Sequence, residues 1–162
     1  KKMINQKQML EVINNVLTQL GSKYNSNNAL SLVYNTGLVE SKYKYLKQIK
    51  GPARGFFQCE PWVAVDIIKN YLKYRVPLMN KVAKVCAIDF EHLQNPNVKD
   101  WEYILTTNIA AQIVMCRLHY RRVPAPLPKE LVAEANYYKK YYNTYQGKAT
   151  VEHYLEVVEK YG

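Results

Sequence analysis

Apolar residues recur at helical spacing along most of the chain. Between residues 3 and 20, hydrophobic positions follow one another three or four residues apart, which is typical of a helix with one buried face. The same spacing predicts helices over residues 28–40, 61–76, 78–90, 100–120, 129–142 and 150–161. Because nearly every periodic segment has the helical period, the sequence predicts the all-α fold class.

Residues at the predicted helix ends agree with these boundaries. Ser26 or Asn27 can cap the second helix, because both side chains accept hydrogen bonds from free backbone N–H groups. Thr150 can cap the last helix in the same way. Asp100 is expected to cap a single long helix over residues 100–120.

The segment between residues 41 and 59 lacks a sustained helical period. It contains the turn-rich run Gly51-Pro52-Ala53-Arg54-Gly55. We expect a loop here, with room for one short β-hairpin between residues 41 and 59. The chain of 162 residues contains no internal repeat and no domain linker. Residues 1–162 are therefore predicted to form a single domain.

Composition adds a strong positive charge to this picture. The formal net charge is +10, which favours an anionic partner such as nucleic acid, a membrane surface or an envelope polymer. A basic surface that is simply solvated is the alternative. No apolar run reaches the ~20 residues of a membrane span, and no signal peptide stands at the start of this chain. The three cysteines show no metal-ligand spacing, so we expect buried free thiols, no metal site and no cofactor.

Glu40 is the first candidate for chemistry. Leu30, Val33, Gly37 and Glu40 share one face of the predicted helix 28–40, so the core-facing stripe ends in a carboxylate. Gly37 would let another segment approach closely. Partial desolvation would raise the pKa of Glu40 and retain the proton that a general acid needs. The alternative is a solvated acid at a frayed helix end.

Two amides make the predicted helix 100–120 a second region of interest. Asn108 and Gln112 lie on its otherwise apolar face. They could form the polar wall of a cleft. Alternatively, the helix lies in the core and its amides bond to backbone groups.

Short motifs follow one another in a definite order. They are Glu40-Ser41, Gly55-Phe56-Phe57-Gln58 with Pro61, Asn108-Ile109, and Tyr141-Tyr142-Asn143-Thr144-Tyr145. In this order and spacing they resemble the catalytic domain of soluble lytic transglycosylases, the goose-type lysozyme-related branch. The family elements are a Glu-Ser pair, Gly-Leu-Met-Gln followed by Pro, an Asn-Ile pair at a helix start, and Ala-Tyr-Asn-Ala-Gly. There is a narrower resemblance to lysozyme-like proteins encoded by tailed bacteriophages, at residues 51–55, 58–61, 141–144 and 147–150.

The chain departs from the family pattern at three places. Phe56-Phe57 replaces Leu-Met, which keeps the bulk and apolar character. Glu60 stands where the family has an apolar residue. Thr144-Tyr145 replaces Ala-Gly, which changes the backbone freedom after Asn143.

The resemblance implies a lysozyme-like helical domain with a catalytic cleft. It implies a peptidoglycan lytic transglycosylase that cleaves the β-1,4 bond between N-acetylmuramic acid and N-acetylglucosamine. Glu40 would be the single catalytic acid, and the products would be 1,6-anhydro-muramoyl sugars. The implied partners are peptidoglycan glycan strands and other phage virion proteins. The implied location is the phage virion or the host cell, acting on the cell wall in the periplasm during infection or lysis.

The resemblance also implies substrate-binding roles for five residues. Gln58 would contact the N-acetyl group, and Phe57 would offer a platform for a sugar face. Tyr142 would donate to Glu40 or to the sugar. Ser41 would hold the Glu40 loop or touch substrate. Asn143 would end its helix or contact a sugar.

Three other functions remain open. A hydrolytic lysozyme would need a second carboxylate, and Glu60 is the nearest acid after Glu40, although it also suits a helix start. A virion structural domain could keep the fold without activity. The Lys and Tyr residues at 42–50 could bind nucleic acid, but no known nucleic-acid motif is present, so this partner is the least favoured.

Overall fold

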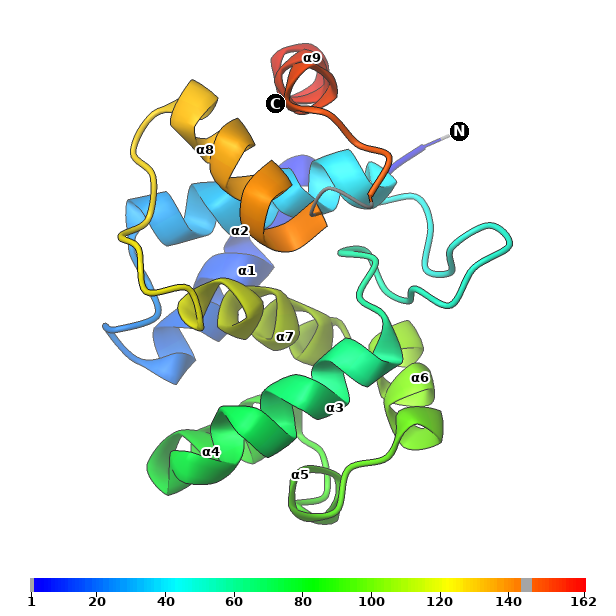
Figure 1. Ribbon diagram of the computed structural model, residues 1–162, viewed down its shortest axis with the longest axis vertical. Helices are drawn as coiled ribbons and strands as arrows, with labels where there is room; N and C mark the ends of the chain where they lie inside the picture. The colour runs from blue at the N-terminus through cyan, green and yellow to red at the C-terminus, as the bar shows by residue number, and fades with distance from the viewer. Residues whose placement is uncertain (1, 144–146) are drawn as a thin grey trace.

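The apolar periods form α-helices throughout the computed structural model, which describes residues 2–143 and 147–162. No β-strand forms within these ranges, so the all-α prediction is confirmed (Figure 1). The helices are α1 (Gln6–Leu20), α2 (Asn27–Ser41), α3 (Pro61–Asn70), α4 (Val76–Cys86), α5 (Glu91–Gln94), α6 (Val98–Thr107), α7 (Ile109–Arg121), α8 (Leu131–Tyr138) and α9 (Val151–Tyr161). A 3-10 turn at Leu72–Tyr74 follows α3, and a π-helical turn at Lys139–Asn143 extends α8.

Helix α2 lies at the centre of the helical assembly. It packs against α1, α7, α8 and α9, and Figure 1 shows α8 and α9 on one side of it and α1 and α7 on the other. Every residue from 32 to 39 is buried. The single core-facing stripe predicted for this helix is therefore too narrow, because neighbouring helices cover it on both sides.

The close approach predicted at Gly37 is confirmed. A Cβ atom at this position would lie 2.3 Å from the hydroxyl oxygen of Tyr43. The Tyr43 ring is 2% exposed, and its hydroxyl donates a 2.7 Å hydrogen bond to the carbonyl oxygen of Tyr34. The ring is therefore held on both sides and cannot move aside.

We expect Gly37→Ala to destabilise the fold by about 1–3 kcal/mol, the usual cost of overpacking a core. Chemical denaturation would measure the free energy of unfolding. The direction of this change is informative, because at an ordinary helix position Ala is more stabilising than Gly by about 1 kcal/mol. An unchanged or increased free energy of unfolding would contradict the close approach.

The single long helix predicted over residues 100–120 is wrong. The chain forms α6 and α7 instead, and they meet at Asn108, whose backbone is extended. The Asn108 side chain accepts a 2.9 Å hydrogen bond from the N–H of Ala111 and donates one of 2.9 Å to the carbonyl oxygen of Cys86. These bonds replace the continuing helical ladder. Asn108 thus caps α7, which agrees with the helix start expected at Asn108-Ile109.

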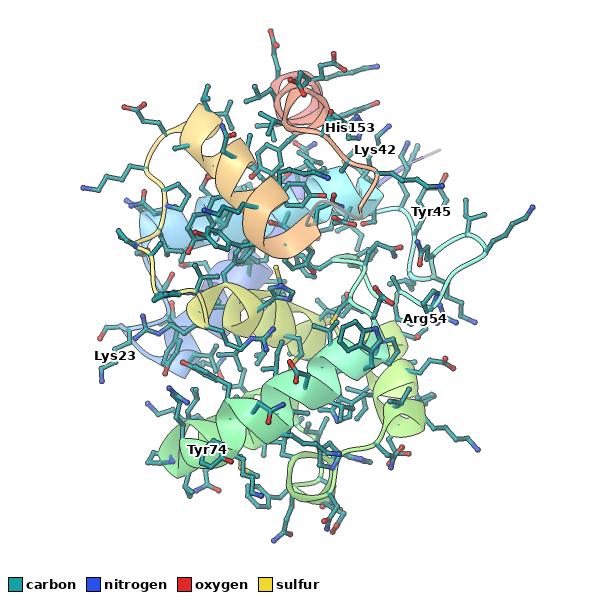
Figure 2. All side chains as sticks on the ribbon, viewed as in Figure 1. Lys23, Lys42, Tyr45, Arg54, Tyr74 and His153 are labelled. Carbon is teal, nitrogen blue, oxygen red and sulfur yellow. The ribbon has the colours of Figure 1, made fainter. Side chains whose placement is uncertain are left out.

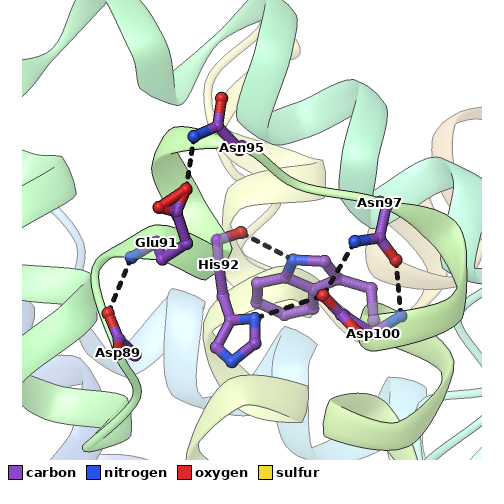
Figure 3. Close-up of polar contacts among 7 residues, drawn as sticks. Asp89, Glu91, His92, Asn95, Asn97 and Asp100 are labelled. Carbon is purple, nitrogen blue, oxygen red and sulfur yellow. Dashed lines mark hydrogen bonds and ion pairs between the residues drawn. The ribbon is translucent and has the colours of Figure 1, made fainter.

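A polar cluster where α5 meets α6 corrects the predicted cap at Asp100 (Figure 3). The cap is Asn97, whose side-chain oxygen accepts a 2.8 Å bond from the N–H of Asp100. Its amide donates to the Asp100 carboxylate at 2.7 Å. His92 lies 3.6 Å from the same carboxylate, and its carbonyl oxygen accepts from the buried Trp101 indole. Asn97 is itself a strong capping residue, so the helix starts earlier.

Three other boundaries can be compared with the structure. Ser26 and Thr150 cap α2 and α9, as predicted, by accepting from backbone N–H groups. The helix predicted over residues 78–90 ends at Cys86, because Ala87 adopts a left-handed conformation with φ 53°.

The β-hairpin considered between residues 41 and 59 does not form. The segment has only isolated antiparallel bridges, from Arg54 to Lys47 and to Cys59. The Arg54 guanidinium donates to the carbonyl oxygens of Gly51 and Ala53 at 2.9 and 3.0 Å. These bonds hold the segment as a folded loop without strands.

Two predictions made from the composition can be compared with the structure. Cys59, Cys86 and Cys116 are buried free thiols, as expected. In the described ranges, no helix has both the length and the apolar character that crossing a membrane requires.

Candidate active site

A cleft of about 900 Å³ lies over the C-terminal end of α2. Its walls come from the end of α2, the loop before α3, α3 itself, the end of α7, the π turn after α8 and the start of α9. The predicted site residues Glu40, Gln58, Tyr142 and Asn143 all line this cleft. Folding thus brings together Glu40 and Asn143, which lie more than a hundred residues apart in the sequence.

Glu40 is held at the cleft by the way α2 ends. Lys42, the residue after the helix, is left-handed with φ 53°, and its N–H bonds the carbonyl oxygen of Leu38. The side chain of Ser41 donates to the carbonyl oxygen of Gly37 at 3.2 Å and accepts from the N–H of Tyr43 at 3.1 Å. The last turn is therefore fixed rather than frayed, and the Glu40 side chain keeps its place.

The Glu40 carboxyl group has an unusual acidity. Burial raises its pKa to about 7, because desolvation penalises the charged form. Hydrogen bonds from the side chains of Tyr138 and Asn143 act in the opposite direction and limit the rise. The Tyr138 hydroxyl donates directly to Glu40 Oε2. A carboxyl group with this pKa can both release and recover a proton near neutral pH.

The sequence pattern did not predict a role for Tyr138, whose position is explained by a buried anchor on the same helix. Glu134, one turn earlier on α8, accepts hydrogen bonds from Asn35 at 2.6 Å and Ser31 at 2.8 Å, both on α2. The hydroxyl of Tyr154 on α9 also donates to Glu134, at 2.6 Å. Three helices are thus joined one turn before Tyr138, which places Tyr138 against the Glu40 carboxyl group. The available signal in the sequence was the cluster of tyrosines at positions 137, 138, 141 and 142.

We expect Tyr138→Phe to raise the pKa of Glu40 above about 7, because this hydroxyl stabilises the ionised carboxylate. Carboxyl-carbon NMR titration of the folded protein would measure it. Tyr142→Phe is the matched control, since the Tyr142 hydroxyl donates instead to the carbonyl oxygen of Phe57 at 2.6 Å. An equal change in both variants would argue against a specific Tyr138 contact.

Tyr142 lies in the cleft without the predicted hydrogen bond to Glu40. Its ring packs against His119, with centroids 4.7 Å apart, and stacks on Tyr120 at 5.2 Å. Burial lowers the pKa of His119 to about 4, so its imidazole is neutral at pH 7. Its Nε2 donates to the carbonyl oxygen of Tyr141 at 3.0 Å. These rings form an apolar wall close to Glu40.

Two predicted substrate-binding residues do not reach the cleft. Phe57 is 1% exposed and packs edge-on against Tyr43. The prediction that it offers a sugar platform is therefore wrong, because an apolar motif position does not reveal which side of the loop faces the core. Ser41 is 3% exposed and bonds only to backbone groups among the described residues. Of the two roles expected for Ser41, the structure therefore favours holding the turn that carries Glu40 over touching substrate.

Gln58 lies in the cleft but is partly engaged with its own loop. Its backbone is left-handed with φ 51°, a conformation that costs energy for residues other than Gly. Its side-chain amide donates a 2.9 Å bond to the carbonyl oxygen of Gly55. The contact to an N-acetyl group stays a prediction.

Asn143 is the last described residue of the π turn, and its side-chain oxygen accepts a 2.8 Å bond from Lys139. Its two expected roles, ending the helix and contacting a sugar, stay predictions. The following Thr144-Tyr145, where the chain departs from the family pattern, lie outside the described residues.

The amides of α7 support the core rather than a cleft wall. Gln112 is 1% exposed, and its side-chain oxygen accepts a 3.0 Å bond from the N–H of Phe56. Its position also explains Gly55, where a Cβ atom would lie 2.7 Å from the Gln112 side chain. Gln112 thus fixes the loop that carries Gln58 from beneath.

Two further residues in the cleft bear on its chemistry. Glu60 lines it and accepts a 3.0 Å bond from the indole of Trp62. Trp62 is 57% exposed and lies at the start of α3. It presents the accessible aromatic face that Phe57 was expected to supply, and its signal in the sequence was a Trp directly after Pro61. Asp66, further along α3, forms a 2.8 Å ion pair with Arg122.

Across residues 2–143 and 147–162, no three His, Cys, Asp or Glu side chains come together in a way that could hold a metal ion.

The chain was compared with known proteins at the level of families, sequences and folds. No family model matches it, and no curated protein or solved structure gives a significant match. The likeness to lytic transglycosylases thus stays a resemblance of short motifs, and the function must be argued from the cleft.

Proposed function

We propose that this protein is a peptidoglycan lytic transglycosylase in which Glu40 is the single catalytic acid and base. The observation that carries the proposal is the Glu40 carboxyl group, whose pKa is raised to about 7 by burial beside a 900 Å³ cleft. A general acid must hold its proton near the operating pH, and a general base must be able to take it back. The four motifs support the choice of substrate.

The proposed reaction uses the same carboxyl group twice. Glu40 first donates its proton to the glycosidic oxygen between N-acetylmuramic acid and N-acetylglucosamine, and the C1–O bond breaks. The carboxylate then takes the proton of the muramoyl C6 hydroxyl while that oxygen bonds to C1. The product is a 1,6-anhydro sugar, no water is consumed, and Glu40 is protonated again.

Neighbouring residues suit both halves of this cycle. Tyr138 and Asn143 stabilise the carboxylate after it has lost its proton, since both hydrogen bonds favour the ionised form. Trp62 offers an exposed indole face on which a sugar ring can stack. Gln58, which lines the cleft, would contact the N-acetyl group. We further propose that the protein acts on the periplasmic cell wall from a phage virion or inside the host.

Hydrolysis is the second candidate, and Glu60 favours it. This acid lines the same cleft as Glu40, and glycosidases that add water use a pair of carboxyl groups. In that reaction Glu60 would activate or orient the water. Its hydrogen bond to Trp62 supports the other interpretation, in which Glu60 positions the indole.

The identity of the products tests the proposal. Purified peptidoglycan treated with the wild-type protein is expected to yield muropeptides ending in 1,6-anhydro-muramic acid, measured by mass spectrometry. Reducing ends, heavier by one water, would instead establish hydrolysis. No cleavage of several wall types by the folded protein would favour a virion structural domain and overturn both enzymatic candidates.

A further inference from the structure

A second cavity, of about 730 Å³, shares only Arg122 with the lining of the Glu40 cleft. It is formed by the turn after α1, the residues on either side of the 3-10 turn that follows α3, α4 and the end of α7. Figure 2 labels Lys23 at this cavity and His153 at the cleft, on well-separated parts of the molecule. Five of the twelve residues that line the cavity are cationic: Lys23, Arg75, Lys81, Arg121 and Arg122. Within the described chain, no acidic residue lines it.

Most of these charges lack a counter-charge in the protein. Arg122 pairs with Asp66 on its cleft side. The other four cations form no ion pair with any described residue. Such a concentration of one sign of charge in a concave site focuses the potential and attracts anions.

A buried arginine adds to the positive potential. Arg117 is 3% exposed, and its Nε donates a 2.8 Å hydrogen bond to the carbonyl oxygen of Tyr24 in the cavity wall. Burial and the nearby charge of Arg121 lower its pKa, but a guanidinium stays charged in proteins. Arg117 therefore fixes the wall and places a further charge close to Arg121.

Two guanidinium groups are held in place by tyrosine rings. Arg75 lies over the Tyr71 ring at 3.7 Å from its centroid and donates to the Tyr71 carbonyl oxygen at 2.9 Å. Arg121 lies over the Tyr24 ring at 5.5 Å. A guanidinium that is already positioned loses less entropy when it binds an anion, and its planar fork matches phosphate oxygens.

The same stacking argues against a nucleic acid. Single-stranded nucleic acids bind by stacking bases on open aromatic faces. Tyr71 is only 9% exposed, and its ring lies under the Arg75 guanidinium. Tyr24, the other tyrosine of the cavity, is partly exposed, but the Arg121 guanidinium lies over its ring. Both tyrosines of the cavity are thus already stacked with a guanidinium.

We propose that this cavity binds the phosphate groups of a linear polyol phosphate, a phosphodiester chain without bases. Four unpaired cations exceed what a single carboxylate would neutralise, whereas successive phosphates of one chain would occupy them together. The inference does not depend on glycan cleavage at Glu40, because the two sites share only Arg122.

The test uses a glycerol phosphate hexamer as the probe and isothermal titration calorimetry as the measurement. The double variant Lys23→Gln/Lys81→Gln removes two exposed cations that have no ion-pair partner among the described residues. We expect it to bind the probe at least about tenfold more weakly, since a single hydrogen bond to a charged group typically changes the affinity by about tenfold or more. Binding should weaken with salt, with a shallower salt dependence in the variant.

A matched control separates the cavity from the net charge. Lys47→Gln/Lys50→Gln removes the same charge from exposed loop positions that line neither cavity nor cleft. It is expected to change the affinity by less than about twofold. Equal losses in the two double variants would overturn the proposal, as would no binding of the probe at low salt. Tighter binding of an oligothymidylate with equally many phosphates, lost in Lys23→Gln/Lys81→Gln, would also overturn it.

Discussion

Glu40→Gln is expected to lower the rate of glycan cleavage by about a thousandfold, the typical contribution of a positioned general acid. Gln keeps the shape of the side chain and can still accept the Tyr138 hydrogen bond, but it has no proton to donate. Release of soluble muropeptides from purified peptidoglycan would measure the rate. Circular dichroism of the same sample would establish that the helices are retained.

Glu60→Gln is the matched control for this experiment, because it removes the other glutamate that lines the cleft. A single-acid transglycosylase should keep most of its activity in this variant. Loss of activity in both variants would indicate the carboxylate pair of a hydrolase. Full activity in Glu40→Gln would contradict the proposed role of Glu40.

Local spacing was sufficient to predict most of the helices, because their burial follows the period of the apolar residues. The caps at Ser26 and Thr150 could be predicted for the same reason, since each precedes the first periodic residue of its helix. Asn108 shows where such reasoning fails. An amide on an apolar face is compatible with a continuous helix or with a break, and the choice depends on the carbonyl of Cys86, which only folding brings near.

The candidate site shows the same division between local and long-range information. The position of Glu40 at the end of α2 follows from the sequence pattern. Its partner Tyr138 does not, because Tyr138 and Tyr142 are four residues apart and would share a face of a regular helix. The π turn at residues 139–143 and the anchor at Glu134 decide which hydroxyl meets Glu40. No local pattern in the sequence predicts whether the Tyr138 or the Tyr142 hydroxyl contacts Glu40.

The stability of the protein should also depend on Glu40, in a way that does not require any activity. The pKa of Glu40 is about 7 in the folded state and 4.5 for an unperturbed glutamate. Between these values the unfolded chain has released the proton while the folded protein still binds it. Stability contributed by this group is therefore lost as pH rises from about 4.5 to about 7, and stays lost above that. The loss amounts to about 3 kcal/mol.

Glu40→Gln is expected to remove this dependence. Near pH 4 both proteins carry a neutral group at this position, so their free energies of unfolding should differ little. At pH 8 the free energy of unfolding of the variant should exceed that of the wild type by about 3 kcal/mol more than it does at pH 4. Urea denaturation at the two pH values measures the difference, and the other acidic residues cancel in it. If the difference in free energy of unfolding does not change with pH, Glu40 is solvated. The acid proposed for the cleft would then lack the raised pKa on which its chemistry depends.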